Sequence, residues 1–391
     1  MNMEHARSPE QTPLTSGFLF TSSEASIRTQ GRCIDVTTPA ADGMTGRFGD
    51  AVKSAFHEAS VQGVNEPILV GAIPFDTRQP SALFIPEHHQ WFDRRTTVSA
   101  PQHVHVPPAE VAFWPAKDAF EAMVADVVSA CQAGRVNKVV LSRLCDLVFH
   151  DTPELEPIMQ ALMYQHPQAY HFHVPLPQGA LIGASPELLV SRQGRRVHSM
   201  PLAGTARRDI DHPEKDQQIA SALKHSGKDT QEHRWVIESM YAVLHQYCYL
   251  LNIPAHPTLL KTPSLWHLAT PLSGQLISTQ TSSLALACAL HPTPALGGAP
   301  RHDALRMIEV LEPFERDMFG GMVGWCDAQG NGEWVVTIRC GQWQRNQRRM
   351  RLAAGAGIVA QSDPYAEWQE TGAKFTTMLQ AFGLPVTQGG F

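Results

Sequence analysis

Short runs of apolar and β-branched residues, partly alternating with polar ones, predict six β-strands in this chain. They are residues 138–149, 169–176, 180–191, 195–200, 320–326 and 332–340. Gln193-Gly194 and Asn331-Gly332 fall between neighbouring runs, and such dipeptides favour tight hairpin turns. Strands joined by tight turns run antiparallel, so the pattern predicts antiparallel sheets.

A second pattern, with spacings of three and four, predicts helices over residues 118–133, 302–311 and the long region 213–251. In the long region Asp229 and Glu232 lie on the same stripe as Val236 and Met240. Burying an unpaired carboxylate is costly, so a core-facing stripe that begins with acids must meet a cation, a donor or a cleft there. The alternative is that the stripe reaches the surface and the acids are solvated.

Residues 354–374 are interpreted as a glycine turn followed by a charged helix. Asp363 can cap that helix and Pro364 suits its first position. Glu367 and Glu370 are three residues apart and share one helix face. Two carboxylates on one face suit Mg²⁺, which prefers oxygen ligands. A solvated acidic first turn, stabilised by the helix dipole, is the alternative.

The same segment contains a G-x-G-x-x-A sequence that resembles a dinucleotide-binding turn. That motif requires a further strand and an acidic residue roughly 20 positions on. After the predicted helix only residues 382–385 and a polar tail precede Phe391. No βαβ unit can be completed there, so nucleotide binding is rejected.

Arg339 lies at the end of the last predicted strand. If that strand is regular, Val335, Thr337 and Arg339 share one face. A buried arginine needs a carboxylate partner, supplied by the protein or by a ligand. Arg339 is therefore a candidate anion-binding residue.

Composition narrows the class of protein. Of 391 residues, 43% are hydrophobic and 17% charged, and the net charge of −6 argues against nucleic acid as the main partner. Seven cysteines without a C-x-x-C pair argue against a disulfide framework and fit a reducing cytoplasm. The N-terminus has no apolar signal region, and no run is long enough to span a membrane. A cytoplasmic protein is expected.

One continuous domain is expected over residues 21–390, with its motif-bearing core at 116–385 and a frayed N-terminus at 1–20. The proline-rich segment 98–117 is interpreted either as a linker or as a surface loop.

Several motifs can be read together. They are residues 138–143 (KVVLSR), 183–188 (GASPEL), 201–208 (PLAGTARR), 228–233 (KDTQEH), 266–270 (WHLAT), 291–298 (HPTPALGG) and 354–374. Their order resembles that of the chorismate-utilising enzymes, and the chain is similar to isochorismate synthases of the siderophore-pathway type over residues 65–385. The resemblance implies an α/β fold of the α+β type, with large antiparallel sheets forming a two-sheet core and helices packed outside.

The resemblance also implies an Mg²⁺ site and a pair of proton-transfer groups. Glu232 and Glu370 would bind the metal directly, with Asp229 and Glu367 acting through water. For hydration of chorismate at C2 with loss of the C4 hydroxyl, the base would be Lys138 and the acid Glu187. Lys138 must then be neutral and Glu187 protonated. Without the resemblance, the alternative interpretations are a snorkelling Lys138 and a solvated Glu187.

The remaining residues implied by the resemblance would bind chorismate. Arg339 and Lys374 would hold carboxylates, and His267 would bond a substrate oxygen or orient Glu187, unless it is a satisfied core histidine. The set implied for substrate binding is Gly204, Thr205, His267, Ala295, Leu296, Phe319, Arg339, Gly355, Gly357 and Lys374. Arg207 and Arg208 are not assigned.

Individual positions separate related activities. Lys138 disfavours an anthranilate synthase, and Ala203 stands where aminodeoxychorismate synthases have a lysine nucleophile. The residues 293–297 differ from the salicylate synthase pattern, which favours stopping at isochorismate. A dead relative acting as a sensor or scaffold should lack an acid, a base or a metal carboxylate, and none is lost. Gly227 and Thr230 depart from the family pattern without an expected loss of activity.

Chorismate is the expected partner, together with Mg²⁺; neither nucleic acid nor a membrane is expected. The product is expected to feed 2,3-dihydroxybenzoate and a catecholate siderophore, with menaquinone and salicylate pathways left open. A monomer is expected, and contact with the next enzyme of the pathway is left open.

Overall fold

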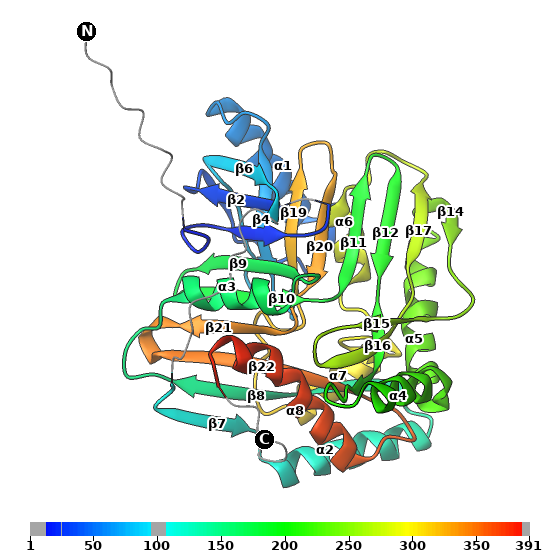
Figure 1. The fold of residues 1–391 in the computed structure, drawn as a ribbon. Helices are drawn as coiled ribbons and strands as arrows, with labels where there is room; N and C mark the ends of the chain where they lie inside the picture. The colour runs from blue at the N-terminus through cyan, green and yellow to red at the C-terminus, as the bar shows by residue number, and fades with distance from the viewer. Residues whose placement is uncertain (1–12, 25, 95–106, 385–391) are drawn as a thin grey trace.

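The computed structural model describes residues 13–24, 26–94 and 107–384, in which two large antiparallel sheets pack against each other (Figure 1). The first has ten strands, and its strands cross those of the second at a steep angle in Figure 1. Its order is β18 (Gly298–Ala299), β8 (Lys138–Val148), β22 (Arg349–Ile358), β21 (Cys340–Gln344), β10 (Gly179–Ser185), β9 (Tyr170–Leu176), β1 (Leu19–Thr21), β2 (Ser26–Gln30) and β6 (His88–Phe92), with β7 (Glu110–Trp114) also pairing with β8.

The second sheet has nine strands, and a third, small sheet has three. The nine-stranded order is β14 (Cys248–Asn252), β17 (Leu272–Leu276), β12 (Arg196–Met200), β11 (Leu188–Gln193), β20 (Gly332–Val336), β19 (Met322–Asp327), β4 (Ile68–Ile73), β5 (Ala82–Ile85) and β3 (Ile34–Val36). The small sheet is β13 (Leu202–Arg207), β16 (Leu265–Ala269) and β15 (Thr258–Lys261). The predicted two-sheet antiparallel fold is confirmed.

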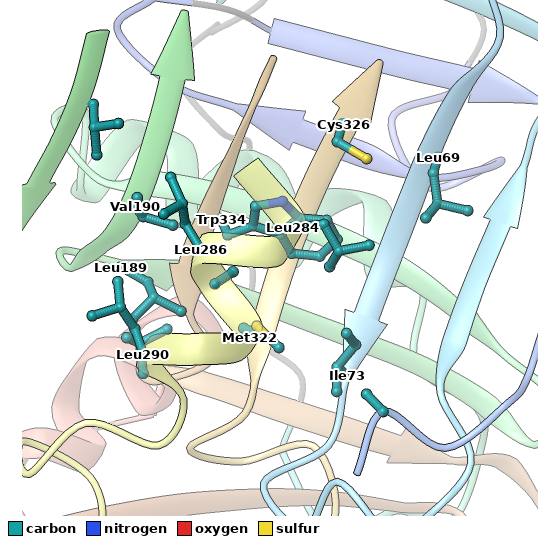
Figure 2. Close-up of a cluster of buried hydrophobic side chains, with 14 of the residues drawn as sticks. Leu69, Ile73, Leu189, Val190, Leu284, Leu286, Leu290, Met322, Cys326 and Trp334 are labelled. Atoms are coloured by element: carbon teal, nitrogen blue, oxygen red, sulfur yellow. The ribbon is translucent and has the colours of Figure 1, made fainter. Parts of the chain in front are cut away.

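Helices cover the outer faces of the two large sheets and pack on the small sheet. They are α1 (Arg47–Val61), α2 (Lys117–Gln132), α3 (Leu155–Gln165), α4 (Pro213–His225), α5 (Gly227–Leu244), α6 (Ser283–Leu290), α7 (Arg301–Leu311) and α8 (Pro364–Ala381). Apolar residues from both sheets, among them Phe20, Phe172 and Val335, form the core between them. Figure 2 shows α6 packed on the other face of the nine-stranded sheet, with Leu284 and Leu290 against Trp334, Leu189 and their neighbours.

Three predicted elements are interrupted in the structure. The run 180–191 is two strands, β10 and β11, which lie in different sheets with Pro186 and Glu187 between them. The run 332–340 is also divided, because β20 ends at Val336 and β21 begins at Cys340 in the other sheet. The region 213–251 contains α4, α5 and the start of β14.

Other expectations also need correction. Gly355 and Gly357 lie within β22, which pairs antiparallel with β8 along its length, and form no turn. Fraying does not extend over 1–20: residues 1–12 lie outside the described residues, but Phe18, Leu19 and Phe20 are fully buried. Of the expected linker or surface loop, 98–117, residues 98–106 also lie outside the described residues. Glu110–Trp114 within it form β7, a strand that pairs with β8.

Candidate active site

The site forms where the chain crosses from one large sheet to the other. Glu187 lies on the crossing from β10 to β11, and Arg339 lies on the crossing from β20 to β21. The two crossings are hydrogen-bonded to each other, since Ala184 N–H donates to the Arg339 carbonyl (3.0 Å) and Val336 N–H to the Glu187 carbonyl (3.2 Å). The breaks in the two predicted strands therefore place an acid and a cation side by side.

Arg339 adopts a left-handed backbone conformation, with φ of 50°. It has therefore left the strand, and the face shared with Val335 and Thr337 that the alternation predicted does not exist. Its side chain is nevertheless buried, and burial lowers the pKa of its guanidinium to about 10. Non-glycine residues with positive φ are uncommon, and a sharp change of strand direction is a context that requires one.

Glu187 is buried, and its surroundings favour the protonated acid. Loss of hydration raises the pKa of its carboxyl to about 7, against the opposing effects of the Leu202 N–H bond to Oε1 (3.4 Å) and of the charges of Lys138, Lys374 and Arg339. A substantial fraction of Glu187 is thus protonated at neutral pH. That is the state required of a group that gives up a proton near pH 7.

Lys138 begins β8, and its ammonium group is completely buried in an ion pair with Glu232 of α5, at 2.9 Å between Nζ and Oε1. Burial pushes the pKa of Glu232 upward, but the charges of Lys138 and Lys228 outweigh it and hold the pKa below its usual value. An opposite charge at this distance stabilises charged Lys138. The neutral lysine expected from the resemblance is opposed by Glu232 in this arrangement.

Gly357 on β22 leaves room for this ion pair. A Cβ added at this position would lie 2.2 Å from Glu232 Oε1 and 2.8 Å from Lys138 Cε. The glycine is therefore needed for the close approach of β22 to the two charged groups.

The first two turns of α5 and α8 supply the four predicted metal carboxylates, each already engaged by a neighbour. Ser226 caps α5 and bonds Asp229, while Asp363 caps α8 as predicted, accepting from Ala366 N–H. Glu367 pairs with Lys228 (2.6 Å) and Glu370 with Lys374 (2.7 Å). Burial and the charge of Glu370 raise the pKa of Glu367 to about 7, and burial also raises the pKa of Asp229.

These carboxylates fit a magnesium ion in their chemistry. Hard oxygen donors suit Mg²⁺, and the buried Oε2 of Glu367 makes no hydrogen bond within the described residues. Glu367 and Glu370 also repel each other electrostatically, which a cation would relieve. In the part of the chain that is described, however, no three acidic, histidine or cysteine side chains are gathered around one point as a finished metal site.

His267 of β16 connects Thr205 of β13 to Arg339. Its Nε2 lies 3.4 Å from Arg339 Nη2 and its Nδ1 lies 3.0 Å from Thr205 Oγ1. A guanidinium can only donate, so Nε2 accepts and the proton is placed on Nδ1, which donates to Thr205. Burial, with the charges of Arg339 and Lys374, holds the pKa of His267 well below its usual value, so the ring is neutral.

One cavity is lined by every residue that the resemblance implied for substrate binding, and also by Glu187 and Glu232. Lys138 and the other three predicted metal carboxylates do not form its wall. Lys374 lines it while donating from Nζ to the Gly355 carbonyl (2.7 Å).

The cavity wall also includes Ala203, which the sequence analysis used only to separate related activities, and residues that it missed: Val140, Pro186, Leu202, Ile338, Ala353 and Ala354. Most of them lie within the motifs quoted above, and Val140 is two positions from Lys138 on the same strand, which is the signal that could have found it. His233, next to Glu232, was also missed. It anchors α5 to the small sheet through the Ala203 carbonyl (3.1 Å) and Thr270 Oγ1 (2.7 Å).

Gly227, which departs from the family pattern, is the first residue of α5 and has open space around it. The cost of glycine in a helix interior therefore does not apply to it.

Comparisons with known proteins identify the family of the chain. Residues 57–383 match the family described as chorismate binding enzyme. The chain is 44% identical to the isochorismate synthase EntC of Escherichia coli K12, over 98% of this chain and 100% of EntC. It is 38% identical to the isochorismate synthase DhbC of Bacillus subtilis, over 94% of each chain.

Two solved structures share the fold of this chain. A crystal structure described as a putative 2,3-dihydroxybenzoate-specific isochorismate synthase, DhbC from Bacillus anthracis, is 37% identical, with a TM-score of 0.87 over 96% of this chain and 98% of that one. Anthranilate synthase component I from Streptococcus pneumoniae, 20% identical, shares the fold with a TM-score of 0.75 over 96% of this chain and 95% of that one. With the family match spanning most of its length, this chain belongs to the chorismate-binding enzyme family.

Proposed function

We propose that the protein is an isochorismate synthase, an isomerase that converts chorismate reversibly to isochorismate. The observation on which this chiefly rests is Glu187, a buried acid with a pKa raised to about 7 in a cavity that Arg339 and Lys374 also line. Chorismate has two carboxylates and a leaving hydroxyl, so it needs cations and a proton donor. The similarity to EntC and the two DhbC proteins supports the same activity.

In the proposed reaction Glu187 gives its proton to the C4 hydroxyl as the bond from C4 to oxygen breaks. Lys138 takes a proton from the water molecule whose oxygen bonds to C2. One water enters and one leaves, so no oxidant or reductant is needed. General acid and base groups of this kind each contribute typically 10²–10⁴-fold to the rate.

Lys138 can accept a proton only as the neutral amine. Its 2.9 Å ion pair with Glu232 stabilises the ammonium, so the proposal requires Glu232 to be engaged elsewhere during turnover. Mg²⁺ is the proposed cofactor, held by Glu232 and Glu370 directly and by Asp229 and Glu367 through water, and when bound it would neutralise a substrate carboxylate and take up developing charge.

Substrate placement follows from the cavity wall. Arg339 and Lys374 would hold carboxylates, aided by backbone amides at Gly204, Thr205, Gly355 and Gly357. His267, neutral and bonded to Arg339, would orient that guanidinium rather than transfer a proton. Ala295, Leu296 and Phe319 would contact the ring.

The proposed place of the enzyme is 2,3-dihydroxybenzoate and catecholate siderophore synthesis, because one structural relative is described as 2,3-dihydroxybenzoate-specific. Within the described residues no helix is long and apolar enough to cross a membrane. A monomer in the cytoplasm, binding chorismate and not nucleic acid, remains the proposal.

The test is to incubate the purified protein with chorismate, with Mg²⁺ or with a chelator, and to separate the products by chromatography. We expect chorismate and isochorismate in equilibrium only when Mg²⁺ is present. Salicylate and pyruvate would instead identify a lyase. Binding of chorismate without any turnover would reject catalysis and favour a sensor.

A further inference from the structure

One edge of β8 has a gap between its strand neighbours. On that edge β18 pairs with Lys138 and Val139, and β7 pairs from Leu144 onward. Between these partners the described strands leave the Val140 carbonyl and the Ser142 amide without a ladder bond. Buried backbone groups require partners, so something else must bond them.

A buried ion pair fills the gap. Glu312, which follows α7, accepts from Ser142 N–H at Oε1 (2.8 Å), and Arg316 donates from Nη2 to the Val140 carbonyl (2.7 Å). The two side chains pair through Arg316 Nε and Glu312 Oε2 (2.8 Å), and only 2% of each is exposed. The pair therefore takes the place of a strand along β8.

Arg316 also reaches a second wall of the cavity. Its Nη1 donates to the Leu296 carbonyl (2.8 Å), and its guanidinium lies over the Phe75 ring at 4.4 Å. Val140 and Leu296 both line the cavity, and Val140 is two positions from Lys138. Alternate residues of a strand share a face, so Val140, which lines the cavity, and Lys138, which pairs with Glu232 of the cavity wall, lie on the same face of β8.

We propose that Glu312 and Arg316 are positioning residues, which hold the start of β8 and the segment containing Ala295 and Leu296 at a fixed separation. This role rests on the proposed function, because it consists in holding Lys138 and the ring pocket of Ala295 and Leu296 at the separation that the reaction needs. A buried ion pair often stabilises no more than apolar residues would, so fixing geometry is a reason for it to be present. Small misplacements of a catalytic group can cost roughly 10²-fold in rate.

The first experiment removes the Arg316 side chain and supplies guanidinium from solution in its place. Access is through a second, outer cavity, which Arg316 and Glu312 line together with Phe75 and Arg306. The Arg316→Ala protein is assayed with chorismate with and without millimolar guanidinium, well below any denaturing concentration. We expect kcat to fall roughly 10- to 100-fold with a smaller change in KM, and guanidinium, but not sodium chloride, to restore part of it. The matched control is Arg306→Ala, an exposed arginine of the same cavity, with kcat unchanged.

A folded Arg316→Ala protein with wild-type kcat would overturn the proposal. So would a loss that guanidinium does not restore and that matches only the fraction of unfolded protein, measured by circular dichroism.

The second experiment does not need turnover. Amide hydrogen exchange at Ser142, measured by mass spectrometry, should accelerate at least tenfold in Glu312→Ala and much less in Glu312→Gln, whose amide oxygen can still accept the bond. Unchanged exchange in Glu312→Ala overturns the positioning role. Absence of isochorismate formation by the unmodified protein would instead reject the proposed function, and the exchange result would still decide the role of the ion pair.

Discussion

The two groups proposed to move protons lie in opposite electrostatic settings within one site. Glu187 has no ion-pair partner among the described residues, and loss of hydration raises the pKa of its carboxyl to about 7. Lys138 is equally buried but is in direct contact with the carboxylate of Glu232. Burial favours the neutral form of either group, whereas an adjacent opposite charge or a hydrogen bond to the charged form favours the charged one.

The difference shows that the fold by itself favours the protonation state that the acid needs, whereas it does not do so for the base. Glu187 is set by its place between the sheets, which needs no ligand. Lys138 depends on what Glu232 contacts. Substituting Glu187 and Lys138 separately should therefore change activity and stability in different ways.

The largest effect is expected from Lys138→Met, which removes the proton acceptor and leaves Glu232 buried without its cation. Turnover of chorismate should fall by about 10³–10⁴-fold, and unfolding free energy should drop by about 3–5 kcal/mol. Denaturant unfolding and product chromatography measure the two effects. The double variant Lys138→Met/Glu232→Gln should recover stability but not activity; recovery of both would contradict the assignment of Lys138 as base.

Glu187→Gln should lower turnover by about 10²–10³-fold, because the amide cannot release a proton to the leaving hydroxyl. In the unmodified enzyme activity should decline as pH rises above about 7, since the acid must be protonated to act. The variant's residual activity should lack this decline. A profile that is the same for both proteins would remove Glu187 from the acid role.

The same substitution predicts a change in stability with pH. Because the folded pKa of Glu187 is raised above its usual 4.5, its contribution to stability is fully present below pH 4.5 and lost as pH rises to about 7. Relative to the wild type, Glu187→Gln should thus gain up to about 3 kcal/mol between pH 4.5 and 7.5. Urea unfolding at several pH values measures it; a constant difference would show that the carboxyl is not raised in pKa.

Gly357→Ala should lower kcat by about tenfold or more, since the added Cβ would meet Glu232 at 2.2 Å and displace the ion pair. Gly355→Ala is the comparison, because its Cβ would meet Val140 and Ser142 at 3.1–3.2 Å, a milder contact. Steady-state kinetics of both variants test this. An equal loss in the two would mean that the ion pair is not the sensitive feature.

The smallest effect is expected from Thr205→Val, which removes the acceptor of the His267 Nδ1–H bond. A net hydrogen bond contributes about 0.5–1.5 kcal/mol, so KM should rise by roughly threefold to tenfold. Thr205→Ser keeps the hydroxyl and should behave as wild type. If Thr205→Ser were as impaired as Thr205→Val, the hydrogen bond would not be the cause.

The strand and helix patterns predicted much of the fold, because local periodicity reflects which face is buried. Asp363 and Pro364 marked the start of α8, and the hairpin predicted near Gln193-Gly194 formed with its turn one residue later, at Gly194 and Arg195. Of the acids on the stripe of α5, Glu232 met the cation Lys138 and Asp229 met the Ser226 hydroxyl, as the cost of burying them required. Motif resemblance then assembled a set of residues that line one cavity.

The sequence patterns did not place the breaks at Glu187 and Arg339. Both segments were interpreted as continuous strands because most of the flanking residues are apolar; Pro186, which lacks the amide hydrogen that a sheet needs, was a local signal of the first break, and the second had no such signal. Only the packing of two sheets requires the chain to leave one and enter the other there. Charge states were equally undecided, since the pKa values of Glu187 and Glu367 depend on burial and on neighbours distant in sequence. Local sequence determined the elements and supplied the chemical groups; long-range contacts decided where each element ends and which groups are charged.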